Sequence, residues 1–163
     1  MIMRIGHGFD IHRFVLNKPL LLGGVEIPYH RGMQAHSDGD VVLHAICDAL
    51  LGAAALGDIG LHFPDDETKW QNTDSRFFLR HVCMLLQERH FSVQNIDVTV
   101  VAQVPKLRPH IESMCKNIAQ DIHIEASCVN VKATTMERLG PIGQEEAIAA
   151  HAVALIVSDK DRL

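Results

Sequence analysis

Hydrophobic and polar residues alternate in some segments of this chain and recur at helical spacing in others. Residues 20–27 read as two short extended pieces separated by two adjacent glycines. Residues 147–158 are ambiguous, because their alanines favour a helix while the alternation of small and larger apolar side chains suits a strand. We choose the strand. Alternation or enrichment in β-branched residues predicts further strands at residues 3–12, 96–102 and 129–134.

Helical spacing is clearest from residue 41 to residue 56. One apolar stripe there is formed by Val42, Ile46, Ala49, Ala53 and Leu56. Capping side chains precede this segment, and a glycine follows it as a stop: Ser37, Asp38, Asp40 and Gly57. Helices are also predicted over residues 74–88 and from about residue 109 to residue 120. The remaining segments read as polar loops, at residues 32–40, 61–73 and 136–146, and the second is long enough for a functional lid.

These elements predict an α+β fold, with a mixed four-stranded-type sheet and helices packed on one face. The length fits a single domain over residues 1–163. A net charge of −5 argues against nucleic acid as a main partner. No segment has the length and apolar character of a membrane span or an export signal, so we expect a cytoplasmic protein. Four scattered cysteines then read as reduced, structural thiols.

A candidate metal site combines the first strand with the clearest helix. Asp10 and His12 are two apart on a strand, so both side chains lie on one face. Asp40, His44 and Asp48 are four apart, so they are expected to share a helix face. Each residue alone is more often part of a solvated surface. Two imidazoles and one carboxylate together suit a catalytic zinc ion with a fourth position open to substrate, although spacing alone does not prove that they converge.

Two further segments have the chemistry of phosphate binding. His36 and Ser37 lie just before the helix start, where free backbone N–H groups favour an anion. Ser37 is equally suited to cap the helix, and Asp38 repels phosphate unless it binds another group, such as a sugar hydroxyl. After the strand at 129–134, threonine hydroxyls can bind phosphate and the carboxylate of Glu137 can hold Mg²⁺. The alternative there is an ordinary Ser/Thr turn.

Five stretches of the chain resemble one enzyme family, the 2-C-methyl-D-erythritol 2,4-cyclodiphosphate synthases. They read GHGFDIHRF, GGVEIP, AHSDGDVVLHAICDALLGAAALGDIGLHFPD, DVTVVAQVPKL and NVKATTMERLG, and the resemblance extends from about residue 3 to residue 157. The resemblance implies a homotrimer with active sites between subunits. It implies zinc ligands at Asp10, His12 and His44, and a second metal ligand at Glu137.

The resemblance also implies which residues contact the substrate. Phosphate contacts correspond to His36 and Ser37, and methylerythritol contacts to Asp58, Gly60 and Asp65. The cytidine pocket corresponds to Ala102, Pro105, Lys106 and Leu107. The full set of implied substrate-binding residues is Asp10, His12, His36, Ser37, Asp58, Ile59, Gly60, Asp65, Ala102, Pro105, Lys106, Leu107, Arg108, Thr134, Thr135, Met136 and Glu137, of which His36 and Thr135 are expected to be catalytic.

The reaction implied by the resemblance is an intramolecular phosphoryl transfer in the non-mevalonate isoprenoid precursor pathway. The 2-phosphate of 4-diphosphocytidyl-2-C-methyl-D-erythritol 2-phosphate attacks the β-phosphorus and releases CMP. Zn²⁺ would orient a phosphate, and Mg²⁺ or Mn²⁺ would bridge the diphosphate. No side chain needs to be a nucleophile, because oriented intramolecular attack can replace roughly 7–11 kcal/mol of barrier.

The chain departs from the family pattern after residue 140. Pro141 and Gln144 stand where the family has an aromatic residue and an arginine, and His151 replaces a usual acid. In the family these positions line an axial cavity of the trimer that can hold isoprenoid diphosphates. Loss of the arginine removes a bidentate phosphate partner, so we expect weaker anion binding there.

Two rival functions remain open at this point. A zinc-dependent phosphohydrolase would share the metal ligands but produce a linear phosphate. A non-catalytic cytidine-nucleotide-binding module would not need His44, so replacing it would leave any turnover unchanged.

Overall fold

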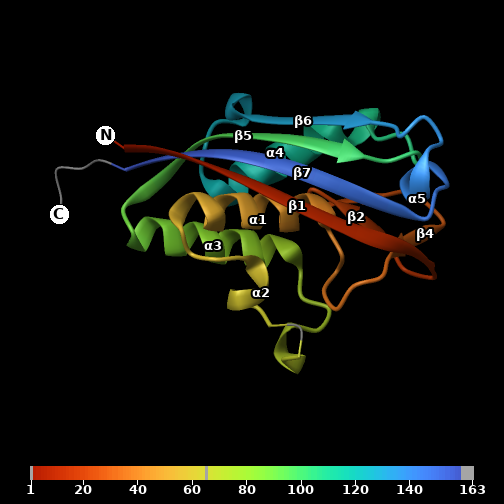
Figure 1. Cartoon of the computed structure of the whole chain (residues 1–163), viewed down its shortest axis with the longest axis horizontal. Helices are drawn as coiled ribbons and strands as arrows, with labels where there is room; N and C mark the ends of the chain where they lie inside the picture. The colour runs from red at the N-terminus through yellow and green to blue at the C-terminus, as the bar shows by residue number, and fades with distance from the viewer. Residues whose placement is uncertain (1, 65, 159–163) are drawn as a thin grey trace.

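The computed structural model describes residues 2–64 and 66–158. Across these residues a five-stranded mixed sheet runs in the order β4-β1-β7-β5-β6 (Figure 1). β5 and β6 are parallel, whereas β1 pairs antiparallel with β4 and β7, and β7 with β5. The strands are β1 (Ile2–Leu16), β4 (Arg31–Met33), β5 (Phe91–Val101), β6 (Val129–Thr134) and β7 (Ala147–Ser158). The predicted α+β class is therefore confirmed.

The predicted four-stranded sheet is wrong by one strand. β1 continues beyond residue 12 to Leu16, and its last residues pair with β4, where Phe14 is opposite Met33. Both side chains are buried, with 8% and 1% of their surface exposed. The segment at residues 32–40, predicted as a polar loop, therefore begins as a strand, because the buried apolar pair of Phe14 and Met33 stabilises the pairing of β4 with β1.

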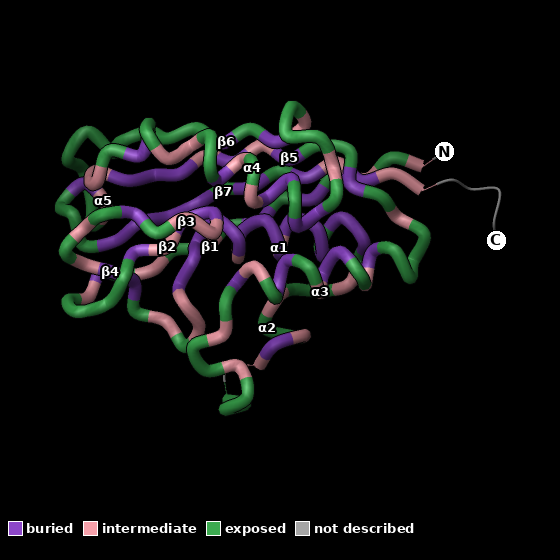
Figure 2. The backbone as a smooth tube through the Cα atoms, turned by 180° about the vertical axis from the view of Figure 1, so that it is seen from behind, coloured by how far each residue is buried: buried purple, intermediate pink, exposed green. Residues whose placement is uncertain are grey.

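Three longer helices pack on the same side of the sheet (Figure 1). They are α1 (Val41–Ala54), α3 (Ser75–Glu88) and α4 (Ile111–Ile122). Figure 2 shows that α1 is buried along most of its length, so it forms the centre of the core. The segments at residues 61–73 and 136–146, which were predicted as loops, each contain short helical turns. Short elements complete the chain: hairpin strands β2 (Leu20–Leu22) and β3 (Val25–Ile27), α2 (Ile59–His62), α5 (Gly140–Gly143), and 3-10 turns η1 (Thr68–Trp70), η2 (Arg108–His110) and η3 (Ala126–Cys128).

Two glycines of β1 allow α1 to lie against the strand backbone. A Cβ atom on Gly6 would come within 1.8 Å of the Ala49 carbonyl oxygen, and one on Gly8 within 1.9 Å of the Ala45 oxygen. No side chain fits at such distances. This contact places the first turns of α1, which carry His44, beside the centre of β1.

The strand at 147–158 is confirmed. β7 forms hydrogen-bonded ladders with β1 on one side and β5 on the other. A helix would leave both neighbours with unpaired edges, so tertiary pairing overrides the helical preference of its alanines. Ala150, Ala152 and Ala154 are fully buried beneath the helices.

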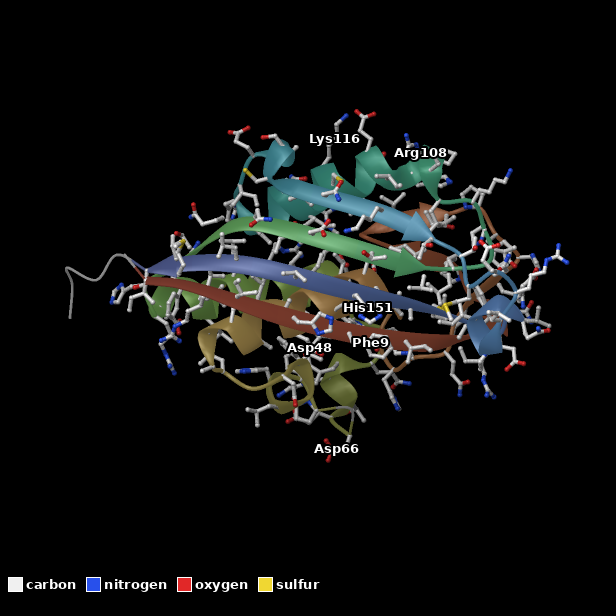
Figure 3. The ribbon with its side chains drawn as sticks, turned by 45° about the horizontal axis from the view of Figure 1, so that its top comes forward. Phe9, Asp48, Asp66, Arg108, Lys116 and His151 are labelled. Carbon is white, nitrogen blue, oxygen red and sulfur yellow. The ribbon has the colours of Figure 1, made fainter. Side chains whose placement is uncertain are left out.

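The opposite face of the sheet, which we call the open sheet face, carries exposed apolar side chains and two histidines. Figure 3 looks onto it, with Phe9 and His151 next to each other. No helix of residues 2–64 or 66–158 packs over these strands on that side. We define the open sheet face by Met3, Ile5, His7, Phe9, Ile11, His151 and Val153, all of them exposed.

The four cysteines are free, as expected. Cys47 and Cys83 are buried, and burial raises the pKa of the Cys83 thiol to about 12, which keeps it protonated. In the part of the chain that the structure describes, no helix has the length and apolar character to cross a membrane.

Candidate metal centre and active site

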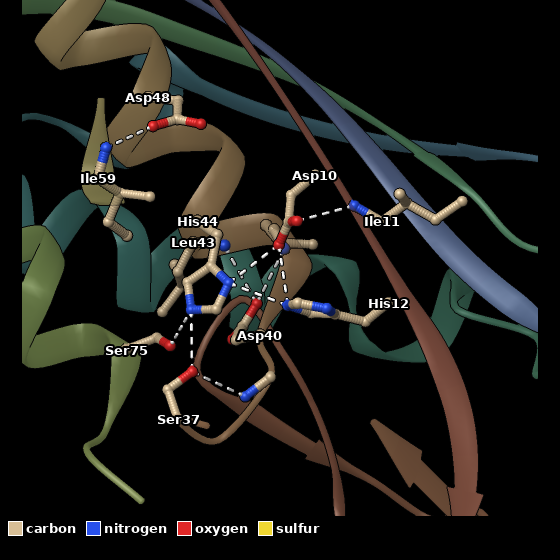
Figure 4. A network of polar contacts seen from close by, with 12 residues as sticks. Asp10, Ile11, His12, Ser37, Asp40, Leu43, His44, Asp48, Ile59 and Ser75 are labelled. Atoms are coloured by element: carbon tan, nitrogen blue, oxygen red, sulfur yellow. Dashed lines mark hydrogen bonds and ion pairs between the residues drawn. The ribbon is translucent and has the colours of Figure 1, made fainter. Parts of the chain in front are cut away.

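Three predicted ligands meet at one point between β1 and α1 (Figure 4). Asp10 Oδ2 lies 2.9 Å from His44 Nδ1 and 3.2 Å from His12 Nε2. The two ring nitrogens are 3.3 Å apart. Three ligand atoms at such mutual distances can surround a single ion, so the predicted convergence is confirmed.

The donor set fits zinc better than a harder cation. Two imidazoles and one carboxylate, with the far side facing a cavity, match a catalytic zinc site that keeps one position for substrate. Mg²⁺ prefers oxygen ligands and retains its waters.

Local structure explains how each ligand is aimed. Asp10 and His12 are in register with the glycines of β1, so they point to the helix side of the sheet. Asp40 caps α1 and accepts hydrogen bonds from the backbone N–H groups of Val42 and Leu43, both at 3.1 Å. It also accepts from Gly23 and Gly24 in the hairpin turn. The prediction that Asp40 shares a helix face with His44 is wrong, because capping turns its side chain into the core.

The second ring nitrogen of His44 is held by two serines. Ser75 Oγ lies 2.8 Å from Nε2 and Ser37 Oγ lies 3.2 Å from it. The Ser75 hydroxyl in turn donates to Asp38 Oδ1. An ion on Nδ1 leaves the proton on Nε2, which then donates to Ser75. The chain from Asp38 through Ser75 therefore selects the tautomer whose Nδ1 lone pair faces the metal position.

Charge and burial act in opposite directions on the ligands. Burial by itself would raise the pKa of the Asp10 carboxyl, but hydrogen bonds from His12 and His44, together with their charge, bring it well below its ordinary value. Burial would lower the pKa of His44, but the hydrogen bond and charge of Asp10, with Asp40 and Asp38 behind it, raise it. The site therefore favours the binding of a positive charge, either a proton or a metal ion.

A cavity of about 780 Å³ opens in front of the centre. It is lined by most of the residues predicted on this side, namely Asp10, His12, His36, Ser37, His44, Ile59 and Gly60. Asp58 instead caps α2 and accepts from the Leu61 N–H at 2.9 Å. Asp65 lies outside the described residues. The volume suffices for a nucleotide-sized ligand.

The predicted phosphate role of the α1 N-terminus is only partly available. Asp40, not Ser37, is the cap, and it already occupies the N–H groups of Val42 and Leu43. Asp38 accepts from the N–H and the hydroxyl of Ser75, and it does not line the cavity. His36 is exposed at the cavity and remains able to donate to a phosphate.

The remaining predicted residues gather at another edge of the sheet. β5 and β6 are parallel and end together, with Val101 opposite Thr134 and the Ala102 N–H donating to the Thr134 carbonyl at 2.9 Å. Thr135 Oγ1 donates to Glu137 Oε1 at 2.7 Å. The residues predicted for cytidine and for the second metal therefore follow two strands that end together: Ala102, Pro105, Lys106, Leu107 and Arg108 follow β5, and Thr134, Thr135, Met136 and Glu137 lie at the end of β6.

Within one chain this edge lies apart from the metal centre. β7 and β5 separate β1 from β6, and three strand spacings amount to about 14 Å. Ala102 and Leu107 are also buried, so their side chains are not accessible to a ligand in the single chain.

Several residues at or behind the site were not predicted. Ser75 is fully buried and contacts a metal ligand, yet its sequence signal is only that of an early helix position. Asp48 lines the cavity together with His44, as the spacing on α1 predicted, but its hydrogen bond from the Ile59 N–H at 2.8 Å, which connects α2 to the helix, was not predicted. Phe63, Trp70 and Phe78 form the apolar wall, and their contacts depend on how a loop folds back.

Known proteins resemble this chain along nearly its whole length. The sequence model of the YgbB family matches residues 3–157. The 2-C-methyl-D-erythritol 2,4-cyclodiphosphate synthases of Thioalkalivibrio sulfidiphilus and Azotobacter vinelandii are each 58% identical over 156 residues, covering 96% of this chain and 98% and 99% of theirs.

Solved structures agree with these relatives. The bifunctional IspDF from Campylobacter jejuni superposes with a TM-score of 0.92 at 44% identity, covering 95% of this chain, which spans 42% of that larger protein. The IspF of Plasmodium falciparum in complex with CDP gives a TM-score of 0.85 at 37% identity, and 97% of each chain is covered.

Proposed function

The chain belongs to the YgbB family and has the cyclodiphosphate synthase activity of its curated relatives, and we propose that the centre formed by Asp10, His12 and His44 carries out that reaction. It is a phosphorus–oxygen lyase of isoprenoid biosynthesis. The single observation that carries the proposed mechanism is the convergence of three ligand atoms beside a cavity of nucleotide size.

The substrate is 4-diphosphocytidyl-2-C-methyl-D-erythritol 2-phosphate. An oxygen of the 2-phosphate bonds to the β-phosphorus, the bond from that phosphorus to the α–β bridging oxygen breaks, and CMP leaves. When bound, zinc supplies a Lewis acid that polarises a phosphate oxygen, and Mg²⁺ or Mn²⁺ at Glu137 neutralises charge across the diphosphate. The protein contributes mainly by holding the two phosphates in line.

We assign the protein groups by their position. His36 and Ser37, beside the metal centre, hold one of the two reacting phosphates, either the β-phosphate or the 2-phosphate. Ile59 and Gly60, which line the cavity, contact the methylerythritol part. Asp58 and Asp65 are proposed to contact it as well. The loop from Ala102 to Arg108 binds cytidine, and Thr134 to Glu137 bind its phosphates, with Thr135 at the reacting group. The CDP complex of the Plasmodium falciparum relative supports a cytidine nucleotide ligand.

The separation of these two groups supports a site shared between subunits. A site shared with a neighbouring chain would bring that chain's β5–β6 edge to the metal centre, whereas within one chain β6 lies three strand spacings, about 14 Å, from β1. We therefore propose a homotrimer. The apolar residues of the open sheet face support such self-association. Sedimentation that finds only monomers at micromolar concentration would argue against it.

Phosphorus NMR tests the reaction directly. Incubation of the substrate with protein, zinc and magnesium should produce a cyclic diphosphate and CMP with no uptake of water. A linear phosphate product would instead indicate a phosphohydrolase. Binding of the substrate without any product would indicate a nucleotide-binding module.

A further inference from the structure

His7 and His151 form a second histidine pair on the open sheet face, remote from the cavity. They come from the adjacent strands β1 and β7, and His7 Nε2 lies 3.2 Å from His151 Nδ1. Both side chains are exposed. We propose that this pair is a second metal site, which takes late divalent transition ions such as Zn²⁺, Ni²⁺ or Cu²⁺.

The geometry reproduces the imidazole half of the metal centre. There, His12 Nε2 and His44 Nδ1 are 3.3 Å apart, and here the same two kinds of ring nitrogen are 3.2 Å apart. Zinc–nitrogen bonds of about 2.0–2.1 Å at a tetrahedral angle put two ligand nitrogens about 3.3 Å apart. The spacing is therefore that of two ligands of one ion, although a direct hydrogen bond between neutral rings has the same length.

The surroundings hold the pair in place. The Phe9 ring packs against His151 with 4.8 Å between ring centroids, and Thr99 of β5 is the register partner of His151 on its other side. Both rings stand on a sheet whose ladders are continuous at these positions. Chelation thus requires little further ordering of either side chain.

Among the described residues no carboxylate joins this pair in a cluster of three possible ligands, which distinguishes it from the metal centre. Asp97 of β5 is held by Asn130 and Lys132. Imidazole ligands alone suit Zn²⁺, Cu²⁺ and Ni²⁺ and disfavour Mg²⁺ or Ca²⁺. The other coordination positions point away from the sheet, where water or a second copy of this chain can complete them. The site does not depend on the proposed reaction, but in the proposed homotrimer the open sheet face would lie between subunits.

Nickel uptake by zinc-loaded protein tests the site. Protein with zinc bound is dialysed against Ni²⁺, and both metals are counted by elemental analysis. We expect the wild type to take up nickel while retaining its zinc. His151→Ala and His151→Gln should bind nickel at least about tenfold more weakly, since even an outer partner of a metal ligand is worth about 10–100-fold in affinity. Both variants should keep zinc and the wild-type rate of CMP release, which also shows that they fold.

Two matched variants make the result specific. His44→Ala should lose zinc and keep the nickel, and His30→Ala, which removes another exposed histidine, should keep both metals. Equal nickel affinity in the wild type and His151→Ala would overturn the proposal. So would nickel that is lost equally from His30→Ala, or nickel that enters only by replacing zinc.

Discussion

Ser75 should control how tightly the metal centre binds zinc, although it is not a ligand. Replacing Ser75 by alanine removes the hydroxyl that lies 2.8 Å from His44 Nε2 and donates to Asp38. The Nε2 atom of His44 then keeps only the longer contact to Ser37, at 3.2 Å, so the ring is less firmly oriented towards the metal position.

The expected loss can be worked from these contacts. Outer partners of a metal-bound histidine are worth about 10–100-fold in affinity, which is about 1.4–2.7 kcal/mol. Asp38 retains the N–H groups of Ser75 and Asp40 as donors, so the fold should lose only about 1 kcal/mol. The substitution should therefore reduce the free energy of zinc binding more than the free energy of unfolding.

Chelator competition measures the zinc affinity, and thermal unfolding of the zinc-free protein measures stability. Ser37→Ala is the matched control, because it removes the longer of the two serine contacts and should weaken zinc binding less than Ser75→Ala. If Ser75→Ala binds zinc within about twofold of the wild type, well short of the typical loss, the orienting role is refuted. The same holds if Ser37→Ala proves the more damaging change.

Four further outcomes are expected. His44→Ala should lose zinc in metal analysis while the chain remains folded, and full occupancy would contradict the ligand assignment. Zinc affinity should rise with pH, because Asp10 raises the pKa of His44 above its ordinary value of 6.5 and a proton then competes for Nδ1. The raised pKa also stabilises the zinc-free protein below pH 6.5. This stabilisation should be lost as the pH rises through the raised pKa, and pH-dependent unfolding of the zinc-free protein measures it. Gly8→Ala should abolish both folding and zinc binding, since its Cβ would lie 1.9 Å from the Ala45 oxygen, and soluble, zinc-loaded variant protein would contradict this contact. Glu137→Gln should retain zinc but need more Mg²⁺ for turnover, and an unchanged Mg²⁺ titration would exclude that role.

The chain's local patterns predicted most helices and strands and the ligands of the metal centre. Period-two alternation placed Asp10 and His12 on one face of a strand, and the apolar stripe of α1 placed His44 on a helix. Such predictions succeed because a strand or helix determines which neighbours in sequence share a face. The same reasoning failed for Asp40, because a capping residue has left the helical geometry on which the spacing argument depends.

The sequence by itself determined the α+β class, the order of the main elements, the three ligand types and the family to which the chain belongs. Only the tertiary structure decided that the ligand atoms come within 3.3 Å of one another, that Ser75 and Asp38 orient His44, and that His7 faces His151 across two strands. The physical reason is that these contacts join residues 31 to 144 positions apart. Their distances depend on strand register and on how closely α1 approaches the glycines of β1, and no local propensity contains that information.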